Sequence, residues 1–560
     1  MVEISKEIIK AYALENAIKH NGKAAQGAVL AGLFQEGLEK SKIKDIMPTI
    51  SKVLKEVNNL SPESQKEQFE KSTSKTSKRV IREGLKELPN AEKRKVTMRL
   101  APFPSGPLHI GNARNIILND EYTKMYEGKL LLCFDDTIGS ANKQIDPESY
   151  ELIKEGLDWL KIKYNKKTIY KSSRTEQYYK YAEELLKKGY LYVCHCNQEK
   201  MQDLKAKGIA CGCREISPEE QLTRWKEMFK AKMGGVTVRL KTSMQDPDPA
   251  FRDRVMFKIS DLTHPKTKGK YRVYPSMEFS WGIDDHIFGS THILRGIDHQ
   301  MSTRVQDFIR GIFKWENPES IYNGHLAIEG VKISKSKGTQ KIILGEYTGY
   351  NDPRTWSLQS LRDRGIKPEA IRQFILSLGI KKNSITTPIE NLYILNKKLL
   401  EDVPRYFFVE NPQKITIKGC PELKAKIPRH PNNSLGNREI KTTQEFLISE
   451  PDFNLLDTQK YRLMHLLTFK ANRDGINPYD FSFVSEKPPT EKTKFLHWLP
   501  ASPDNIHIEI IMPDGNTKKG LGEYELEKLK VGDTIQFERF GFCRLHKKEK
   551  EKLEFWFAHN

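Results

Sequence analysis

The stretch from Val96 to Asn115 reads VTMRLAPFPSGPLHIGNARN and decides the fold. Its first residues are typical of a β-strand, its prolines and Gly106 predict a tight turn, and its last residues open a helix. Gly111 lets the backbone approach a ligand, and the helix start offers N–H groups and a positive dipole end to a phosphate. His109 can donate to a phosphate or ribose oxygen, although a lone histidine in such a turn is more often structural.

The same pattern continues along the chain. The segment 129–136, KLLLCFDD, reads as a second apolar strand, and 146–161, DPESYELIKEGLDWLK, reads as a second helix. Alternation of strands and helices predicts a parallel, doubly wound sheet of the Rossmann type. The pattern resumes near Tyr274 and runs past Lys332, so the segment between is expected to be an inserted domain.

The regions before and after the strand–helix alternation have different sequence patterns. The N-terminal region has apolar residues at helical spacing, and KSTSKTSK (71–78) reads as a solvated linker. Helices are expected from Pro353 to about Leu400, followed by short alternating strands typical of a β-barrel or sandwich. The expected parts are a helical region and linker (1–92), the first half of the Rossmann domain (93–180), an insertion (181–273), the second half (274–325), a lysine loop with connecting helices (326–400) and a β-barrel region (401–560).

A cationic loop lies about 220 residues after the first motif. Residues 331–338 read VKISKSKG, with Lys332, Lys335 and Lys337 separated by small residues. A mobile loop of this kind suits a triphosphate whose charge shifts during a reaction. Taken alone, the segment reads better as an exposed basic loop.

Composition narrows the class of protein. The 560 residues exceed what one hydrophobic core normally holds, and 93 Lys and Arg against 73 Asp and Glu favour a polyanionic partner. A generally lysine-rich proteome would give the same surplus. The N-terminus lacks the order of a signal peptide, and no apolar run is long enough to cross a membrane. The protein is therefore expected to be soluble and cytoplasmic, without a membrane partner.

Four of the seven cysteines lie in one short segment. Cys194 and Cys196 form one C-x-C pair, and Cys211 and Cys213 form another. Four thiolates on two short loops can close a tetrahedral structural zinc site. The alternative is a small apolar cluster of reduced thiols.

Together, the histidine turn and the lysine loop resemble the HIGH and KMSKS motifs of class I aminoacyl-tRNA synthetases. FDDT (134–137) and YPSMEFSWGIDDHIFGSTHILRGIDH (274–299) narrow the resemblance to the glutamyl/glutaminyl branch. The β-rich end resembles the archaeal and eukaryotic form, whose anticodon-binding part is β-barrel, whereas bacterial glutamyl enzymes have helices there. Asn112 replaces the second histidine of HIGH, a position where glutamyl enzymes commonly vary.

The resemblance implies two groups of residues around ATP. The first group is the histidine turn with the start of its helix: Pro102, Phe103, Pro104, Ser105, Gly106, Pro107, Leu108, His109, Ile110, Gly111 and Asn112. The second group is the lysine loop: Lys332, Ile333, Ser334, Lys335 and Ser336. In the expected mechanism, the first group holds phosphate, and Lys335, supported by Lys332, neutralises charge on the leaving pyrophosphate, with Mg²⁺ assisting.

The resemblance also implies an amino-acid pocket. Arg99 and Arg295 would bind carboxylates and Asp135 the α-ammonium, because fork-shaped cations suit carboxylates. Arg295 favours glutamate over glutamine by roughly 2–5 kcal/mol, because glutamine would leave a buried charge unpaired. Met277 stands where the family usually has a pocket tyrosine. Two other departures lie nearby: Trp281 replaces a smaller side chain, and Cys133 replaces an arginine.

The implied reaction joins glutamate to tRNA. The glutamate α-carboxylate would attack the ATP α-phosphorus, and the terminal ribose 2′-OH of tRNA would then attack the adenylate. The alternatives are a glutaminyl-tRNA synthetase and a catalytically silent tRNA-binding paralogue. The chain is expected to be monomeric, with a possible amidotransferase or synthetase-complex partner if tRNA-Gln is also charged. Residues near Arg539–Arg544 are candidates for reading the anticodon.

Overall fold

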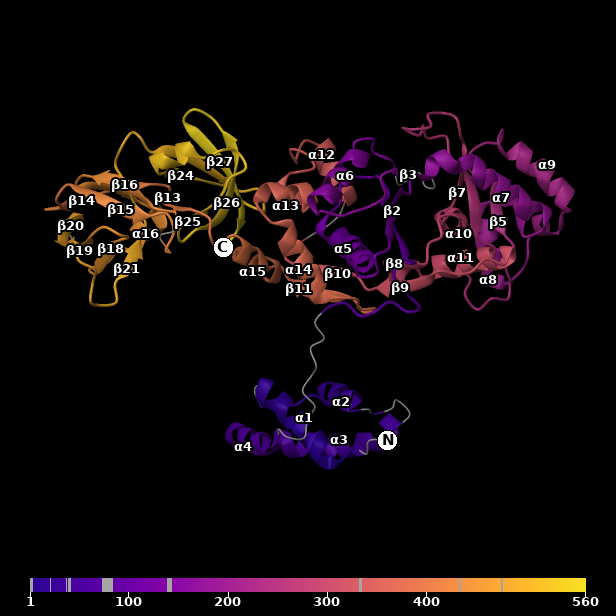
Figure 1. The fold of residues 1–560 in the computed structure, drawn as a ribbon, viewed down its shortest axis with the longest axis horizontal. Coiled ribbons are helices and arrows are strands. Elements are labelled where there is room, and N and C mark those ends of the chain that lie inside the picture. Colours follow the sequence, from indigo (N-terminus) through magenta and orange to yellow (C-terminus); the bar gives the residue numbers. More distant parts are fainter. Residues whose placement is uncertain are drawn as a thin grey trace. The chain divides into compact units, whose positions relative to one another are not determined.

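The computed structural model describes residues 4–20, 22–36, 38, 42–72, 84–137, 144–331, 335–432, 435–474 and 477–560. The chain divides into two compact units, residues 1–84 and 85–560 (Figure 1). The predicted linker 71–78 falls almost entirely outside the described residues. Across the described ranges, none of the helices combines the length and the apolar character that crossing a bilayer requires.

The first unit is helical, as its apolar spacing predicts. Ser5 caps the first helix by accepting a hydrogen bond from Ile8 N. Gly32 lies so close to the Tyr12 ring that a Cβ there would meet it at 2.3 Å. Inside the bundle, Gln65 Nε2 donates to Val57 O at 2.9 Å. The helices are α1 (Lys6–Lys19), α2 (Gln26–Gln35), α3 (Ile43–Asn58) and α4 (Pro62–Ser72).

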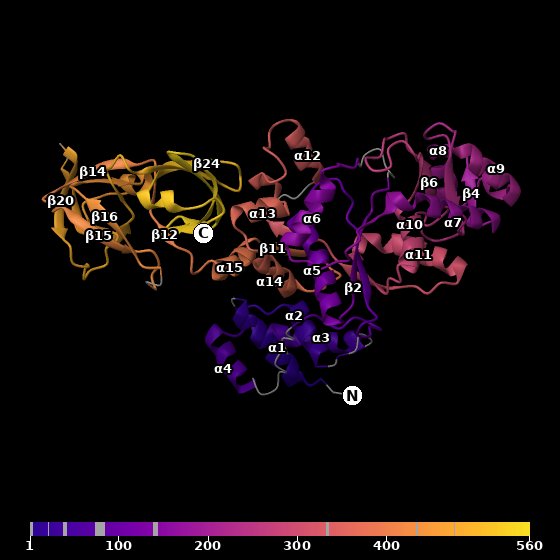
Figure 2. The same ribbon diagram turned by 45° about the horizontal axis from the view of Figure 1, so that its top comes forward.

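A parallel sheet forms the centre of the second unit, as the strand–helix alternation predicts. β1 (Thr97–Leu100), β2 (Lys129–Phe134) and β3 (Ile169–Tyr170) pair in parallel, and so do β8 (His292–Gly296) and β9 (Glu319–Asn323). β8 runs beside β1, since Thr291 N donates to Thr97 O at 2.9 Å. The helices α5 (Ile110–Met125) and α6 (Ser149–Trp159) follow β1 and β2 along the chain (Figure 2).

An antiparallel sheet forms the inserted part. Its strands are ordered β4-β5-β6-β7. The core on this sheet includes Phe279, Ile283, Val305 and Ile309 from α10 and α11, so these two helices pack on the insertion as well as leading to β8 and β9. The elements are η3 (Lys171–Arg174), α7 (Thr175–Lys187), β4 (Leu191–Cys194), α8 (Gln198–Lys207), η4 (Gly212–Glu215), α9 (Pro218–Met228), β5 (Thr237–Leu240), β6 (Val255–Ile259), β7 (Val273–Pro275), α10 (Met277–Ile287), η5 (Ile297–His299) and α11 (Gln300–Phe313).

The connecting region is mainly helical, with one strand pair that the sequence did not indicate. β11 pairs in parallel with β10, and both strands are short. Arg364, at the end of α13, is fully buried and donates to the carbonyl oxygens of Phe557 and Ala558 near the C-terminus. The elements are β10 (Leu326–Glu329), α12 (Lys335–Ile343), η6 (Pro353–Thr355), α13 (Leu358–Arg364), α14 (Pro368–Leu378), β11 (Ile385–Pro388) and α15 (Glu390–Leu399).

The remainder is β-rich, as predicted, and consists of two seven-stranded sheets and a hairpin. The sheet orders are β21-β18-β19-β20-β14-β17-β22 and β12-β25-β26-β27-β23-β24-β13, and the second curls into a near-barrel (Figure 2). The elements are β12 (Arg405–Tyr406), β13 (Phe408–Glu410), β14 (Gln413–Lys418), β15 (Leu423–Pro428), β16 (Asn437–Thr442), β17 (Glu445–Ile448), α16 (Glu450–Asn454), β18 (Lys460–Leu463), β19 (Thr468–Asp474), β20 (Asn477–Ser485), β21 (Lys494–Leu496), β22 (Leu499–Pro500), β23 (Ile506–Ile511), β24 (Thr517–Gly522), η7 (Tyr524–Lys528), β25 (Thr534–Phe537), β26 (Gly541–Lys548) and β27 (Lys552–His559).

A buried ion pair links the hairpin to the near-barrel. Arg438 on β16 donates to both carboxylate oxygens of Glu523, at 2.5 and 2.9 Å, and the two side chains are at most 2% exposed. Glu523 also accepts from Phe407 N at 2.6 Å. Because both charges are removed from water, breaking this pair leaves a buried carboxylate without its counterion.

Arg438→Met is therefore expected to destabilise the β-rich region by about 3–5 kcal/mol. The change is measured by urea unfolding combined with hydrogen–deuterium exchange of β15 and β16 peptides. Lys426→Met on the same hairpin is the control, since its pair with Glu439 is exposed and its loss should cost less than about 1 kcal/mol. Equal effects of the two variants would contradict the interpretation.

Candidate active site

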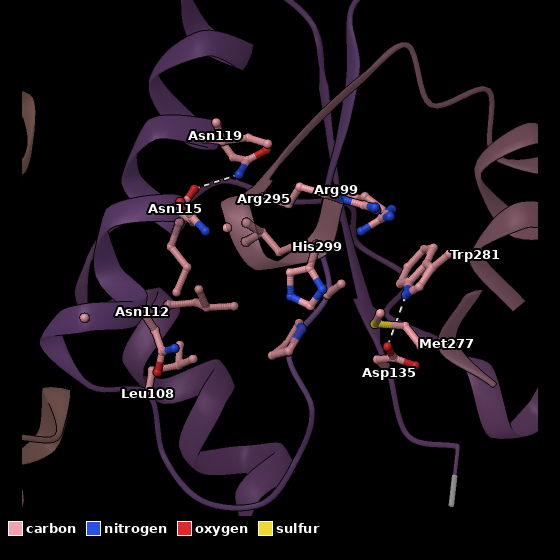
Figure 3. Close-up of a pocket in the computed structure, with 18 residues that line it drawn as sticks. Arg99, Leu108, Asn112, Asn115, Asn119, Asp135, Met277, Trp281, Arg295 and His299 are labelled. Carbon is pink, nitrogen blue, oxygen red and sulfur yellow. Dashed lines mark hydrogen bonds between the residues drawn. The ribbon is translucent and has the colours of Figure 1, made fainter. Parts of the chain in front are cut away.

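A cavity of about 240 Å³ opens where β1 and β8 end side by side (Figure 3). The carboxyl ends of these strands form the switch point of a doubly wound sheet, where such folds bind ligands. The lining residues are Arg99, Leu100, Ala101, Pro102, Leu108, Gly111, Asn112, Asn115, Ile116, Asn119, Asp135, Leu157, Met277, Trp281, Leu294, Arg295, Gly296 and His299. All four residues predicted to bind glutamate lie on this one cavity.

The histidine turn forms one wall of the cavity and is fixed by distant parts of the chain. Ile110 N donates to Trp356 O and Leu358 N donates to Leu108 O. Asp135 N, after β2, donates to Pro102 O at 3.1 Å. These backbone bonds hold the start of α5 at the carboxyl end of the sheet, beside the cavity that Gly111 and Asn112 line. A helix N-terminus in this position suits an anion.

The predicted residues of the turn have different positions. Pro102, Leu108, Gly111 and Asn112 line the cavity. Ile110 is instead part of the hydrophobic core. The remaining residues shape the turn or begin the helix: Phe103, Pro104, Ser105, Gly106, Pro107 and His109.

Asn112 has a structural function that accounts for its departure from the HIGH pattern. Its Oδ1 accepts a hydrogen bond from His109 N at 3.2 Å, at the start of α5. This bond satisfies one of the N–H groups that the first turn of a helix leaves open.

The helix that follows the lysine loop lies next to the histidine turn. A Cβ built on Gly106 would lie 3.9 Å from Thr339 Oγ1 and 3.8 Å from the Tyr350 ring. Tyr350 OH donates to Asp146 Oδ2 at 2.7 Å, and Asp146 N donates to Pro104 O. The two motifs, far apart in sequence, are therefore neighbours in space.

Part of the lysine loop lies outside the described residues, namely Lys332, Ile333 and Ser334. Lys335 and Ser336 are the first residues of α12, but their side chains also lie outside the described part. Thr339 is one helical turn after Lys335, so the described contact places the start of α12 close to the histidine turn.

The two arginines of the pocket differ in whether a carboxylate lies beside them. Arg99 forms two hydrogen bonds with Asp285, at 2.5 and 3.0 Å, and its guanidinium lies 3.5 Å from the centre of the Trp281 ring. Arg295 Nη1 instead donates to the neutral Thr303 Oγ1 and Gln306 Oε1, at 3.0 and 2.9 Å. No carboxylate of the described ranges pairs with Arg295.

Arg295 therefore brings an uncompensated positive charge to the cavity wall. Burial and the nearby Arg99 lower the pKa of Arg295 to about 10, which leaves the guanidinium charged at neutral pH. A buried cation that lacks a counterion favours binding of an anion. The site can thus select a ligand that carries one more carboxylate than ammonium.

Asp135 lies on the opposite side of the cavity from the helix start and has two polar partners (Figure 3). Its Oδ2 accepts from Trp281 Nε1 at 3.1 Å, and its Oδ1 lies 3.0 Å from Lys171 Nζ. Trp281, one of the departures from the family pattern, is thus part of the site. Met277, one turn earlier on α10, lines the cavity without offering a hydrogen-bond donor.

Sequence reasoning missed several residues of the site. Asn115 and Asn119 follow Asn112 along the cavity face of α5, and His299 precedes α11. Lys171 directly follows β3 at the same edge of the sheet. Two signals in the sequence could have found them: polar residues three to four apart on one helix face, and a charged residue directly after an apolar strand.

The four clustered cysteines have the geometry of a metal site. Their Sγ atoms all lie within 4.8 Å of one another, with Cys194 to Cys211 at 3.9 Å and Cys196 to Cys213 at 4.0 Å. Sulfur atoms at the corners of a tetrahedron with Zn–S bonds of about 2.3 Å lie roughly 3.8 Å apart. The residues present therefore fit a zinc ion.

The arginines suggested for anticodon reading have partners within the chain. Arg539, in the turn between β25 and β26, donates to both oxygens of Asp452 on α16, at 2.8 and 2.9 Å. Arg544 Nε donates to Gly532 O, and its guanidinium lies 3.6 Å from Asp363. Both side chains therefore have structural contacts, and a role of this segment in anticodon reading stays a prediction.

Comparison with known proteins places this geometry in a family. The model of the catalytic domain of tRNA synthetases class I (E and Q) matches residues 95–402, and two models of the anti-codon binding domain of the same family match 403–481 and 495–546. The chain belongs to the class I tRNA synthetases of the E and Q branch. Members of this class are ATP-dependent aminoacyl-tRNA ligases.

Relatives in this family match over their full length. A glutamate–tRNA ligase of Methanocaldococcus jannaschii is 41% identical over 563 residues, covering 99% of this chain and all of the relative. The Pyrococcus abyssi protein of the same name is 42% identical over 580 residues, covering all of both chains. That of Methanothermobacter thermautotrophicus is 37% identical over 560 residues and covers 99% of each. The resemblance seen in the two motifs thus extends along the whole chain.

Proposed function

We propose that this class I synthetase is a glutamate–tRNA ligase, which activates glutamate with ATP and transfers it to tRNA. The observation that carries the proposal is Arg295, a buried cation on the cavity wall with only neutral hydrogen-bond partners. The full-length relatives named glutamate–tRNA ligase support the same assignment.

The charges around the cavity favour glutamate over glutamine. Arg99 is compensated by Asp285, and Asp135 by Lys171, which leaves Arg295 in excess. Burial lowers the pKa of His299, so this ring is uncharged at neutral pH. Glutamate, with two carboxylates and one ammonium, compensates the excess, whereas glutamine leaves a buried charge unpaired.

The geometry supports a direct attack on ATP. Glutamate held by Arg295 at one carboxylate and by Asp135 at its ammonium would present its α-carboxylate toward the histidine turn. The start of α5 and His109 would hold phosphate, and Lys335 with Lys332 would neutralise charge growing on pyrophosphate. Mg²⁺, bound mainly through the phosphates, would supply further neutralisation. The ribose 2′-OH of tRNA would then attack the adenylate.

The tRNA would contact the insertion and the β-rich region. The anti-codon binding models match most of the β-rich part, and the insertion adjoins the cavity through α10 and α11. We include tRNA-Gln as a possible second substrate, which an amidotransferase partner would then process. The chain would act as a monomer in the cytoplasm.

Arg295→Gln is expected to raise the KM for glutamate by roughly 30-fold or more, the equivalent of about 2–5 kcal/mol. Glutamate binds more weakly because the neutral amide of the substituted side chain cannot neutralise the second carboxylate of the ligand. Glutamate-dependent ATP–pyrophosphate exchange in the presence of tRNA measures it, with glutamine assayed in parallel. Arg304→Gln on α11 is the control, since Arg304 pairs with Asp246 and does not line the cavity. An unchanged preference for glutamate over glutamine would contradict the proposal.

Lys335→Ala is expected to reduce the rate of adenylate formation by about 10²–10³-fold, the usual effect of removing one group that stabilises developing charge. Pyrophosphate exchange with tRNA present measures this rate. Lys341→Ala on the same helix is the control, because Lys341 pairs with the surface residue Glu346. Glutamate-dependent ATP turnover that survives Lys335→Ala would show that the assigned role is wrong.

We also propose that Cys194, Cys196, Cys211 and Cys213 hold a structural zinc ion. Cys211→Ser is expected to lower zinc from about one ion per chain to none and to lower the thermal midpoint of the insertion. Elemental analysis and hydrogen–deuterium exchange of β4 and η4 measure both effects. Cys420→Ser, at a buried cysteine outside the cluster, is the control. Wild-type protein purified without zinc, or equal effects of both variants, would refute the site.

A further inference from the structure

Lys171 lies next to the amino-acid cavity at a position fixed by strand register. β2 and β3 pair in parallel with Cys133 opposite Ile169 and Phe134 opposite Tyr170. Asp135 is the residue after β2, and Lys171 is the residue after β3. The register therefore places these two side chains at the same edge of the sheet, where the cavity opens.

The contacts of Lys171 are confined to the acidic side of the cavity. Its Nζ lies 3.0 Å from Asp135 Oδ1 and 4.2 Å from the centre of the Trp281 ring, and its side chain is 0% exposed. Lys171 does not line the cavity, whereas Asp135 and Trp281 do. A ligand would therefore meet Asp135, and Lys171 would act on the ligand only through that carboxylate.

The other charged groups near Lys171 already have partners. Arg99 is bound to Asp285, as described above. Arg174 donates to Asp284, which also accepts from Tyr178 OH at 2.5 Å. Burial raises the pKa of Asp284, and Lys171 and Arg174 oppose that rise, so Lys171 acts on both acids. Among the described residues, Asp135 is the acid that lies within ion-pair distance of Lys171.

The remaining titratable neighbours carry no charge. Cys133 lies two residues before Asp135, so both side chains are on the same face of the β2 segment. Burial raises the pKa of the Cys133 thiol well above its usual range, so the thiol stays protonated. His299, across the cavity, is neutral because burial lowers its pKa. Neither group can replace the ammonium of Lys171 as a counterion.

We propose that Lys171 is a positioning residue for the amino-acid substrate: together with Trp281 it orients the Asp135 carboxylate and supplies its counterion, so that the carboxylate binds the substrate α-ammonium. This inference rests on the proposed function, because it concerns how the same pocket recognises glutamate. A carboxylate accepts up to about four hydrogen bonds, so Asp135 can bind Lys171, Trp281 and an ammonium together.

Lys171 gives Asp135 a counterion before a substrate arrives. An isolated carboxylate at a buried site is driven toward its protonated form, because burial penalises the charge. A protonated Asp135 could not attract an ammonium. The ion pair with Lys171 removes this penalty, and the Trp281 Nε1–H holds the second oxygen in place.

The test is the pH dependence of substrate affinity in Lys171→Met, which keeps the length of the side chain and removes its charge. Without a counterion, Asp135 takes up a proton as the pH falls, so the KM for glutamate is expected to rise about tenfold from pH 8 to pH 6. The wild type is expected to change by less than about twofold, since it keeps the Lys171 ammonium 3.0 Å from the Asp135 carboxylate. Pyrophosphate exchange with saturating ATP and tRNA measures both.

Glutarate, which has the two carboxylates of the substrate but no ammonium, distinguishes a role of Lys171 in ammonium binding from a general disruption of the pocket. Measured as a competitive inhibitor of glutamate, it does not need an ionised Asp135. Its inhibition constant in Lys171→Met is therefore expected to stay constant or fall from pH 8 to pH 6, opposite to the KM for glutamate. Parallel weakening of both ligands, independent of pH, would mean that Lys171 only supports the fold and would overturn the proposal.

Two further variants complete the test. Lys171→Arg keeps the charge and is expected to restore the flat pH profile, whereas Lys266→Met removes an exposed lysine that lies 4.0 Å from the Tyr170 ring and should change nothing. If Lys171→Met does not fold, Lys171→Gln serves in its place. A flat profile in the neutral variant overturns the inference about Lys171. Absence of glutamate-dependent exchange in the wild type would instead overturn the proposed function.

Discussion

The site depends on the adjacent carboxyl ends of β1 and β8, from which the chain leaves in different directions. The two strands begin together, since Thr291 N bonds to Thr97 O, and their last residues line one cavity. The chain leaves β1 through the histidine turn into α5 and leaves β8 toward α11, so the connections part and open a space. Arg99 and Arg295 reach this space because each stands near the end of its strand. The pocket is thus a consequence of the order in which the strands of the sheet are connected.

The charges around the cavity are arranged in pairs, with one exception. One face of α10 carries Met277, Trp281 and Asp285 at intervals of four residues, so a single helix supplies an apolar wall, a ring and the counterion of Arg99. Since Lys171 compensates Asp135, only Arg295 remains in excess. An unpaired buried cation lowers the stability of the empty protein, and a ligand with one net negative charge relieves that cost. The preference for an anionic ligand and the lower stability of the empty protein thus have the same origin.

The sequence predicted the local elements well but missed the contacts between distant elements. The strand, turn and helix around His109 are encoded by adjacent residues, as are Arg295 and the paired cysteines. The partnership of Lys171 with Asp135 depends instead on the register of β2 with β3, which no local pattern specifies. Likewise, no local pattern in the sequence indicates that Arg539 pairs with Asp452, which is 87 residues away. The β10–β11 pair was hidden for the same reason.

The histidine turn and the C-terminal strand are held by one short segment of the chain. Trp356 and Leu358 form backbone hydrogen bonds with the turn, and six residues later Arg364 binds the carbonyl oxygens at the end of β27. Both sets of bonds are buried, where exchange with water cannot replace a lost partner. The segment between them is mostly the short, buried helix α13, which cannot stretch. The histidine turn and the β-rich region are consequently fixed to the same short helix.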